Sequence, residues 1–226
     1  MTQFIDRTVA GRALAALLIR YRGREDVLVL GLPRGGVPVA AEVAEILEAP
    51  LDVMVVRKLR APRQPEFAIG AIASGGVTVM NEAIAGMLED SPQLRSEITY
   101  QRAELKRCES FYRNDRLPLD IRRRTVILVD DGAATGASLR AAVGAARKLR
   151  AARVVAAVPV APADAIEILR DEADEVVCVL TPRFFSSVGE WYREFEQVAD
   201  MEVCALLARA HALDHRKFSP IRSAQD

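Results

Sequence analysis

The chain is poor in residues that hold metal ions or form disulfides. Its 226 residues include two histidines and three cysteines. His211 and His215 have the spacing of neighbouring positions on one helix face, but they lack the glutamate of a zincin motif, which disfavours a metal centre on them. Cys108, Cys178 and Cys204 are odd in number, far apart and set among apolar residues. This pattern predicts reduced core thiols in a cytosolic protein.

Long apolar runs and an excess of one charge are also missing. No run approaches the ~20 residues that span a bilayer, and no charged-then-apolar signal segment opens the chain. The formal net charge is zero, so the chain has no general attraction for nucleic acid or an anionic membrane. We therefore expect a soluble, cytoplasmic protein that binds any anion through a local cluster of residues.

Short apolar runs recur along the chain, at 27–30, 53–56, 126–129, 154–158 and 176–180. They are continuous rather than alternating, as in strands that are buried on both faces of a parallel sheet. Helical patterns open the chain over 4–22 and follow the first, third and fourth runs. This alternation predicts an α/β fold with a doubly wound, mostly parallel sheet. Without repeats or low-complexity linkers, residues 1–226 are predicted to form a single domain.

Two segments interrupt the alternation. Residues 59–80 contain Pro62, Pro65, Gly70, Gly75 and Gly76, which predicts a long loop with a short strand pair. Residues 91–114 begin with a serine–proline pair, a good start for a helix, and carry apolar residues on one helical face. The second segment is therefore predicted to be a helical insertion.

The stretch VILVDDGAATGAS, residues 126–138, places two acids and a loop of small residues after a predicted strand. Carboxyl ends of parallel strands are where open α/β sheets bind ligands. Small residues let backbone N–H groups approach an anion, and the following helix N-terminus attracts negative charge. Acceptors for hydroxyls beside donors for a phosphate suit a ribose 5-phosphate. The alternative is a plain strand-to-helix turn with two surface acids.

Competing phosphate-binding motifs are not found. The chain has no G-x-x-x-x-G-K-[ST], which disfavours a P-loop nucleotidase, and no G-x-G-x-x-G follows a strand.

The same stretch resembles the phosphoribosyl-diphosphate motif of the type I phosphoribosyltransferases. Other family parts follow in order: GLPRGGVPVA (31–40) is similar to the pyrophosphate loop, and VVRK (55–58) to the basic end of the second strand. More narrowly, LPRGGVP, VRKL, FAIGAIASGG and FSSVGEWYREF resemble a bacterial stand-alone subgroup of unknown acceptor. The resemblance implies a lid loop at about 59–76, a helical insertion at about 82–114, and a hood with the C-terminal segment at about 181–215. It also implies a non-proline cis peptide at Pro33-Arg34.

The resemblance implies a Mg²⁺-dependent transfer of the phosphoribosyl group from phosphoribosyl diphosphate to an amine acceptor, usually a nucleobase, with release of pyrophosphate. Asp130 and Asp131 would hold the ribose hydroxyls, stabilise the cationic transition state, and meet Mg²⁺ through water. Arg34, Arg57 and Lys58 would bind the pyrophosphate. The expected catalytic residues are thus Asp130, Asp131, Arg57 and Lys58, and the expected substrate-binding residues are Arg34, Gly35, Gly36, Gly132, Ala133, Ala134, Thr135, Gly136, Ala137 and Ser138.

The acceptor is less defined. Some purine enzymes of the family have a third acid where this chain has Ala134, and the A-T-G form of the loop resembles the adenine and uracil branches. The aromatic segment 181–195, with Phe184, Phe185, Trp191 and Tyr192, is expected to stack on a nucleobase. A satellite core or a dimer contact remains the alternative.

Two classes of function stay open. The first is the enzyme. The second is a regulatory module on the same fold that binds phosphoribosyl diphosphate or a nucleotide without catalysis, because a fold alone does not fix the function. The retained basic residues and the glycine-bearing loop favour the enzyme. A homodimer through the helix at 92–114 is also left open.

Overall fold

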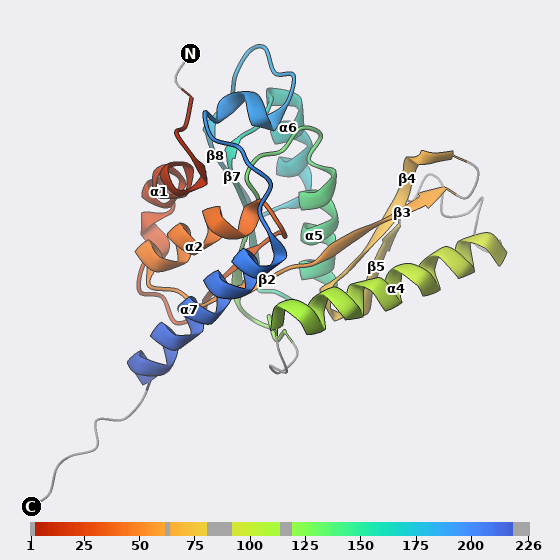
Figure 1. Ribbon diagram of the computed structural model, residues 1–226, viewed down its shortest axis with the longest axis horizontal. Coiled ribbons are helices and arrows are strands. Elements are labelled where there is room, and N and C mark those ends of the chain that lie inside the picture. Colours follow the sequence, from red (N-terminus) through yellow and green to blue (C-terminus); the bar gives the residue numbers. More distant parts are fainter. Residues whose placement is uncertain (1–2, 62–63, 81–91, 114–118, 219–226) are drawn as a thin grey trace, which may run out of the picture.

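A five-stranded parallel sheet forms the centre of the molecule, in the order β2-β1-β6-β7-β8 (Figure 1). The computed structural model describes the backbone of residues 3–61, 64–80, 92–113 and 119–218, and their side chains except 61, 64–68 and 213–218. The strands are β1 (Val27–Gly31), β2 (Leu51–Val53), β6 (Thr125–Val129), β7 (Arg153–Val160) and β8 (Glu175–Leu180). The predicted doubly wound α/β class is confirmed.

Helices cover both faces of this sheet (Figure 1). On one face lie α1 (Arg7–Leu17) and α2 (Gly36–Leu47), and α7 (Asp200–Phe218) packs on α2 and β2. On the other face lie α5 (Ala137–Lys148) and α6 (Ala163–Glu172). α1, α2, α5 and α6 lie close to their predicted positions, whereas α7 was not predicted as a helix. The first predicted helix, over 4–22, is shorter: the Asp6 side chain caps its start, and a 3₁₀ turn, η1 (Ile19–Tyr21), follows Leu18.

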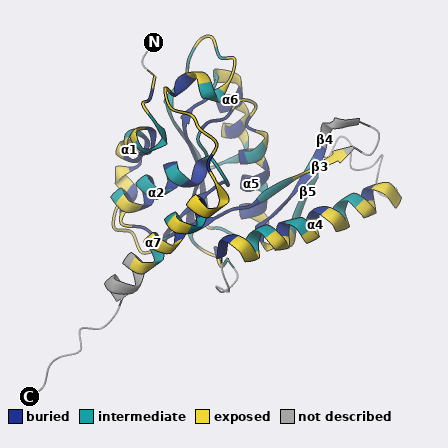
Figure 2. Cartoon of the chain, viewed as in Figure 1, coloured by how far each residue is buried: buried dark blue, intermediate teal, exposed yellow. Residues whose placement is uncertain are grey.

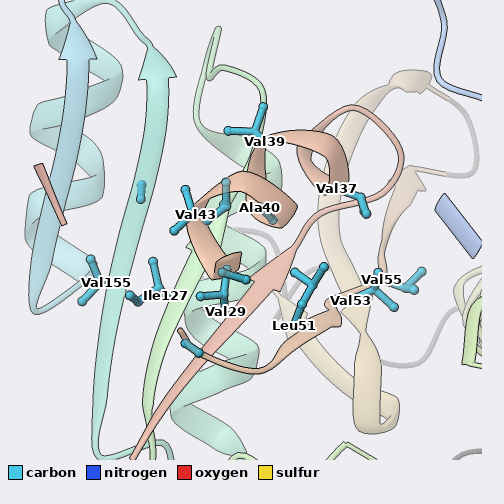
Figure 3. Packing of buried hydrophobic residues seen from close by; sticks show 14 of the residues in the cluster. Val29, Val37, Val39, Ala40, Val43, Leu51, Val53, Val55, Ile127 and Val155 are labelled. Atoms are coloured by element: carbon cyan, nitrogen blue, oxygen red, sulfur yellow. The ribbon is translucent and has the colours of Figure 1, made fainter. Parts of the chain in front are cut away.

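Strand residues alternate between the two helix layers, although nearly every position of β1 and β6 is apolar. Val29, Ile127 and Val155 lie opposite one another on adjacent strands and face α2, where they pack near Ala40 and Val43 (Figure 3). The residues between them in sequence belong to the cluster under α5 and α6. Because both faces of the strands are covered, β1 and β6 are buried at all positions.

An arm of antiparallel strands extends from one edge of the central sheet (Figure 1). It consists of β3 (Val56–Ala61), β4 (Gln64–Ala73), the 3₁₀ turn η2 (Ser74–Gly76) and β5 (Val77–Met80). The long loop predicted for 59–80 is therefore wrong, because β4 alone runs ten residues. Pro65, one of the residues that suggested a loop, is the second residue of β4. Residues 62–63 lie outside the described residues, and closure of this segment as a lid stays a prediction.

The strand predicted at 53–56 is a corner between two sheets. Val53 ends β2, and the amide of Met54 donates to Gly31 in the central sheet. Val55 instead pairs with Ser74: its amide donates to the serine hydroxyl, and its carbonyl accepts from the serine amide. A continuous apolar run does not reveal where the chain leaves one sheet for another, because all these positions are buried.

The helix predicted within 91–114 is confirmed as α4 (Pro92–Arg113), which packs against the arm, while its outer face is exposed (Figure 2). Residues 81–91, the first part of the predicted insertion, lie outside the described residues. Within the part of the chain that is described, no helix is long and apolar enough to cross a membrane.

A buried ion pair fastens the end of α4 to the central sheet. Arg113 Nη2 donates to Asp52 Oδ2 over 2.7 Å, and each side chain is 11% exposed. Asp52 Oδ1 accepts the amide of Val53 over 2.7 Å. Such a pair gives little net stability against an apolar replacement, but losing one partner leaves an uncompensated buried charge.

We predict that Asp52→Ala lowers the free energy of unfolding by about 3–5 kcal/mol, because Arg113 is left buried and unpaired. Urea denaturation measures the change. Asp120→Ala, which removes the exposed Asp120–Arg122 pair, is the matched control and should cost less than about 1 kcal/mol. Equal costs for the two variants would contradict the assigned role, whereas adding Arg113→Met to Asp52→Ala should recover stability.

Candidate active site

The loops after β1 and β6 meet at the carboxyl edge of the sheet. β1 leads through α2 to β2 on one side, whereas β6 leads through α5 to β7 on the other. Loops that diverge from adjacent strands leave a crevice, which is where open α/β sheets bind ligands. The cis peptide expected at Pro33-Arg34 is present in the first of these loops. The sequence-predicted acids and the predicted pyrophosphate loop are therefore adjacent.

Two glycines allow this close approach. A Cβ atom at Gly35 would overlap the carboxylate of Asp131, and one at Gly36 would lie 2.6 Å from the carbonyl oxygen of Val129 and 2.8 Å from Asp130 Cα. The neighbours at Gly36 are backbone atoms, and the carboxylate at Gly35 is held in place by Arg7. Gly36 also begins α2. Any side chain here would separate the first loop from the acidic pair.

Asp130 and Asp131 have different surroundings. Asp130 Oδ1 accepts the amide of Asp131 over 2.9 Å. Asp131 Oδ2 accepts from Arg7 Nε over 2.9 Å and pairs with Arg7 Nη2 at 2.8 Å. Burial, together with the neighbouring charge of Asp131, raises the pKa of Asp130 well above its usual value. Burial also raises the pKa of Asp131, and the Arg7 guanidinium opposes that rise.

The loop after the acids offers amide donors. The amides of Ala134, Thr135 and Gly136 donate to no other described residue, whereas the amide of Ala133 is used by Val160. Gly136 has a φ of 71°, the left-handed conformation that glycine tolerates, and α5 begins at the next residue. Thr135 Oγ1 accepts the amide of Ala137 over 3.4 Å. Free amides at a helix N-terminus form an anion site.

A cavity of about 230 Å³ joins the loop to Asp130 and Lys58. Its walls also include Gly132, Ala133, Ala134, Thr135, Gly136, Ala137, Ser138, Leu139 and Val188. The volume is below the ~300–1,000 Å³ of pockets that enclose whole ligands, so the cavity suits one part of a substrate. A neighbouring cavity of about 620 Å³, between α5 and the arm, shares Lys58 and Ala137 with it. Lys58 thus stands at the junction of the two cavities.

The other predicted pyrophosphate cations point elsewhere. Arg57, the neighbour of Lys58 on β3, faces α4, where its Nε donates to Gln101 Oε1 over 3.0 Å. Arg34 Nη1 lies 3.8 Å from Asp200 Oδ2 at the start of α7. The structure therefore brings Lys58 together with Asp130 and the loop, but directs the side chains of Arg34 and Arg57 toward α7 and α4.

The aromatic residues of the predicted hood also divide. Trp191, which ends the 3₁₀ turn η3 (Val188–Trp191), and Tyr192 are 7% and 4% exposed and pack with Phe4 in a satellite core. Phe185 packs against this core, whereas Phe184 is 73% exposed. The satellite-core interpretation thus describes Trp191 and Tyr192. Stacking on a nucleobase stays a prediction, with Phe184 as the accessible ring.

Several contacts at the site were not predicted. Arg7 comes from the first helix and reaches Asp131 across 124 positions of sequence. Gln101 on α4 holds Arg57, and Val188 in η3 fills the space beside Gly132. Local sequence patterns carry no signal for such pairs, because each joins residues that are far apart in the chain.

Comparisons with known proteins agree with this geometry. The sequence model of the phosphoribosyl transferase domain family matches residues 6–193, and the chain belongs to that family. Two provisionally named phosphoribosyl transferases of Mycobacterium tuberculosis, strains CDC 1551 and H37Rv, are each 48% identical over 229 residues. The match covers 100% of this chain and 51% of theirs, so the chain spans about half the length of these relatives.

A solved structure is also similar. The crystal structure of TT1426 from Thermus thermophilus has a TM-score of 0.82 and 44% sequence identity, and the match covers 92% of this chain and 98% of that one.

We predict that Gly132→Ala disrupts the contact between η3 and the small-residue loop 132–136, which we call the phosphate loop. A Cβ atom there would lie 2.5 Å from Val188 Cγ1, and overpacking of this kind costs about 1–3 kcal/mol. Thermal unfolding should show the loss. Adding Val188→Ala removes the clash and should restore most of the stability, and Val188→Ala alone is the control. Failure of the second substitution to rescue would show that Val188 does not limit this position.

Proposed function

We propose that the protein transfers the 5-phosphoribosyl group of phosphoribosyl diphosphate to an amine nitrogen, in a Mg²⁺-dependent reaction that releases pyrophosphate, and that the acceptor is a nucleobase. The observation that carries the proposal is the cavity where unpaired loop amides, the Asp130 carboxylate and the Lys58 ammonium converge. Family membership supports the use of phosphoribosyl diphosphate.

The cavity matches the substrate in polarity. The amides of Ala134, Thr135 and Gly136, with the α5 N-terminus, are suited to the 5-phosphate. A carboxylate accepts hydrogen bonds, so Asp130 is suited to the ribose hydroxyls. Lys58 supplies positive charge at the mouth of the cavity for the leaving pyrophosphate. The substrate is thereby oriented with its phosphate at α5 and its ring beside the acids.

In the reaction, the bond from C1 of the ribose to the pyrophosphate oxygen breaks and a bond to the acceptor nitrogen forms. The nitrogen loses a proton to solvent, and pyrophosphate leaves with the bonding electrons. Positive charge develops on the ring during this exchange. A fixed carboxylate beside the ring stabilises that charge without reorganising, which is the electrostatic contribution that we assign to Asp130.

The acidic pair suits a cation that arrives with the substrate. Arg7 is the one basic side chain recorded in contact with the two carboxylates among the described residues, and it contacts only Asp131. No described group of three or more histidine, cysteine or acidic side chains is arranged to hold a metal alone. Mg²⁺ commonly binds through one or two carboxylates plus substrate oxygens and water. It would neutralise charge on the leaving pyrophosphate, and Asp130 and Asp131 would meet it through water.

The regulatory alternative also has support in the structure. Arg34 and Arg57, which resemble pyrophosphate ligands of the family, are directed to Asp200 and Gln101. A module that only binds would not need them in the crevice. A panel of nucleobases incubated with phosphoribosyl diphosphate and Mg²⁺ separates the two functions, because only the enzyme releases pyrophosphate. Binding without release for every base would favour the regulatory module.

The cytoplasmic location stays a prediction from the cysteines, which are all free.

We predict that Asp130→Asn lowers turnover by about 10²–10³-fold, because the developing positive charge loses its fixed carboxylate. The melting temperature should stay the same or rise, because the substitution removes a charge that is buried beside Asp131. Pyrophosphate release and thermal unfolding measure the two effects. Turnover within a few-fold of the parent chain would remove Asp130 from the reaction.

A further prediction separates Lys58 from Arg57. Lys58→Ala should weaken binding of phosphoribosyl diphosphate by about tenfold, or ~1.4 kcal/mol, and should reduce the ligand-induced rise in melting temperature. Arg57→Ala should change it less, because Arg57 faces α4. Ribose 5-phosphate, which lacks the pyrophosphate, is the control ligand. If Lys58→Ala weakens both ligands equally, Lys58 serves the 5-phosphate instead.

A further inference from the structure

The Arg7 guanidinium is held at the site by contacts with three residues, Asp131, Glu196 and Phe195. Its Nε and Nη2 both meet Asp131 Oδ2, and its Nη1 donates to the carbonyl of Glu196 over 2.8 Å. The guanidinium carbon lies 4.0 Å from the centre of the Phe195 ring. The Arg7 side chain is 12% exposed. A guanidinium with two hydrogen-bonding directions and an aromatic face has little freedom to swing toward a substrate.

The segment around Arg7 is tied to the hood. The amide of Phe4 donates to Trp191 over 2.8 Å, and the amides of Arg193 and Glu194 donate to Phe4 and Ile5 over 2.9 Å each. Asp6 then caps α1 by accepting the amide of Val9. Arg7, the first residue of α1, is therefore fixed both by the helix and by the hood segment.

Asp131 is enclosed on its other sides as well. The hydroxyl of Tyr192 donates to the backbone carbonyl of Asp131 over 2.5 Å, and Gly35 presses against the carboxylate. Burial and the acidic pair raise the pKa of the Tyr192 phenol, so it remains a donor. Among the described residues that line the phosphate-loop cavity, Asp130 is included and Asp131 is not. Asp130 thus faces the cavity, whereas the Asp131 carboxylate faces Arg7.

We propose that the two acids have separate tasks and that Arg7 is a positioning residue. Arg7 fixes the side chain of Asp131, which contacts α1, the hood segment and the loop after β1. The fixed Asp131 in turn sets the backbone position of its neighbour Asp130, the acid that lines the cavity and meets the ribose. This inference deepens the proposed function and rests on it for its kinetic test.

The experiment compares Arg7→Met with Arg12→Met in the full chain. Arg12 lies on the same helix and pairs with Glu42 rather than with Asp131, and its side chain is 63% exposed, which makes it a matched control. Arg7→Met should lower kcat by about 10²-fold, because small misplacements of reacting groups cost about that much. The KM for phosphoribosyl diphosphate should change by less than about threefold, since the phosphate loop is intact. Arg7→Lys should recover part of the loss. A raised KM with unchanged kcat would overturn the proposal, because it would make Arg7 a substrate ligand.

A double-mutant cycle tests whether Arg7 acts through Asp131. Asp131→Asn keeps an oxygen that can accept from Arg7, so it should cost less kcat than Asp130→Asn. Combining Arg7→Met with Asp131→Asn should be no worse than Arg7→Met alone, because partners in one contact are not additive. Additive losses, or equal losses at the two acids, would overturn the division of tasks.

Trp191 gives a readout that needs no activity. It is the only tryptophan of the chain and lies in the hood core beside the Phe4 segment. Arg7→Met should increase quenching of its fluorescence by acrylamide, and Arg12→Met should leave quenching unchanged. Unchanged quenching in both variants would overturn the positioning role of Arg7. If Arg7→Met raises the quenching but the parent protein releases no pyrophosphate with any base, only the proposed function is contradicted.

Discussion

The site depends on placing two carboxylates side by side at the end of a buried strand. Like charges so close, and partly removed from water, are unfavourable, and burial raises the pKa of both Asp130 and Asp131. The fold compensates one acid with a protein cation, because Arg7 pairs with Asp131. Among the described residues, the Asp130 carboxylate accepts one hydrogen bond, from the Asp131 amide. Because no described cation contacts Asp130, its carboxylate remains able to stabilise the cationic transition state of the proposed reaction. A fully neutralised pair would be more stable and would have less to offer the substrate.

The same pair explains why small residues surround it. Gly35 and Gly36 bring the first loop against the acids, and Gly132 makes room for Val188 on the other side. Each of these contacts joins segments that are distant in sequence, so the site forms only when β1, β6 and the hood segment are all in place. The arm and α4 then bring Lys58 to the mouth of the cavity, with the Arg113–Asp52 pair fastening α4 to β2. Stability of the scaffold and geometry of the site are therefore linked.

The sequence predicts the central sheet well because burial on both faces imposes continuous apolar runs, and four of the five predicted runs are strands. It fails at 53–56, where burial continues through a corner between two sheets, and at 59–80, where prolines and glycines in the sequence suggest a loop but the chain forms long strands. The acids and the small-residue loop are predicted because they are contiguous. Arg7 is not, because it is one of 31 basic residues and its partner is 124 positions away. The orientation of Arg57 is not predicted either. Arg57 and Lys58 are neighbours on one strand, so their side chains point to opposite faces. Only the packing of α4 on one of these faces decides which of the two residues reaches the site.

The polarity of the cavity limits what can select the acceptor. Amide donors lie at one end and the Asp130 carboxylate at the other, so the groups in the cavity wall suit a phosphate and hydroxyls. A flat, largely neutral nucleobase offers these groups little to recognise. The residues that distinguish one base from another must then lie beyond the acids and the loop, in the hood or the arm. In the hood, Trp191 and Tyr192 are buried in the satellite core, and the Tyr192 hydroxyl donates to Asp131, so the proposed contact with an acceptor falls to exposed residues such as Phe184. The loop and acids that we propose to bind phosphoribosyl diphosphate are thus predictable from the sequence, whereas the surroundings of the proposed acceptor site depend on long-range packing.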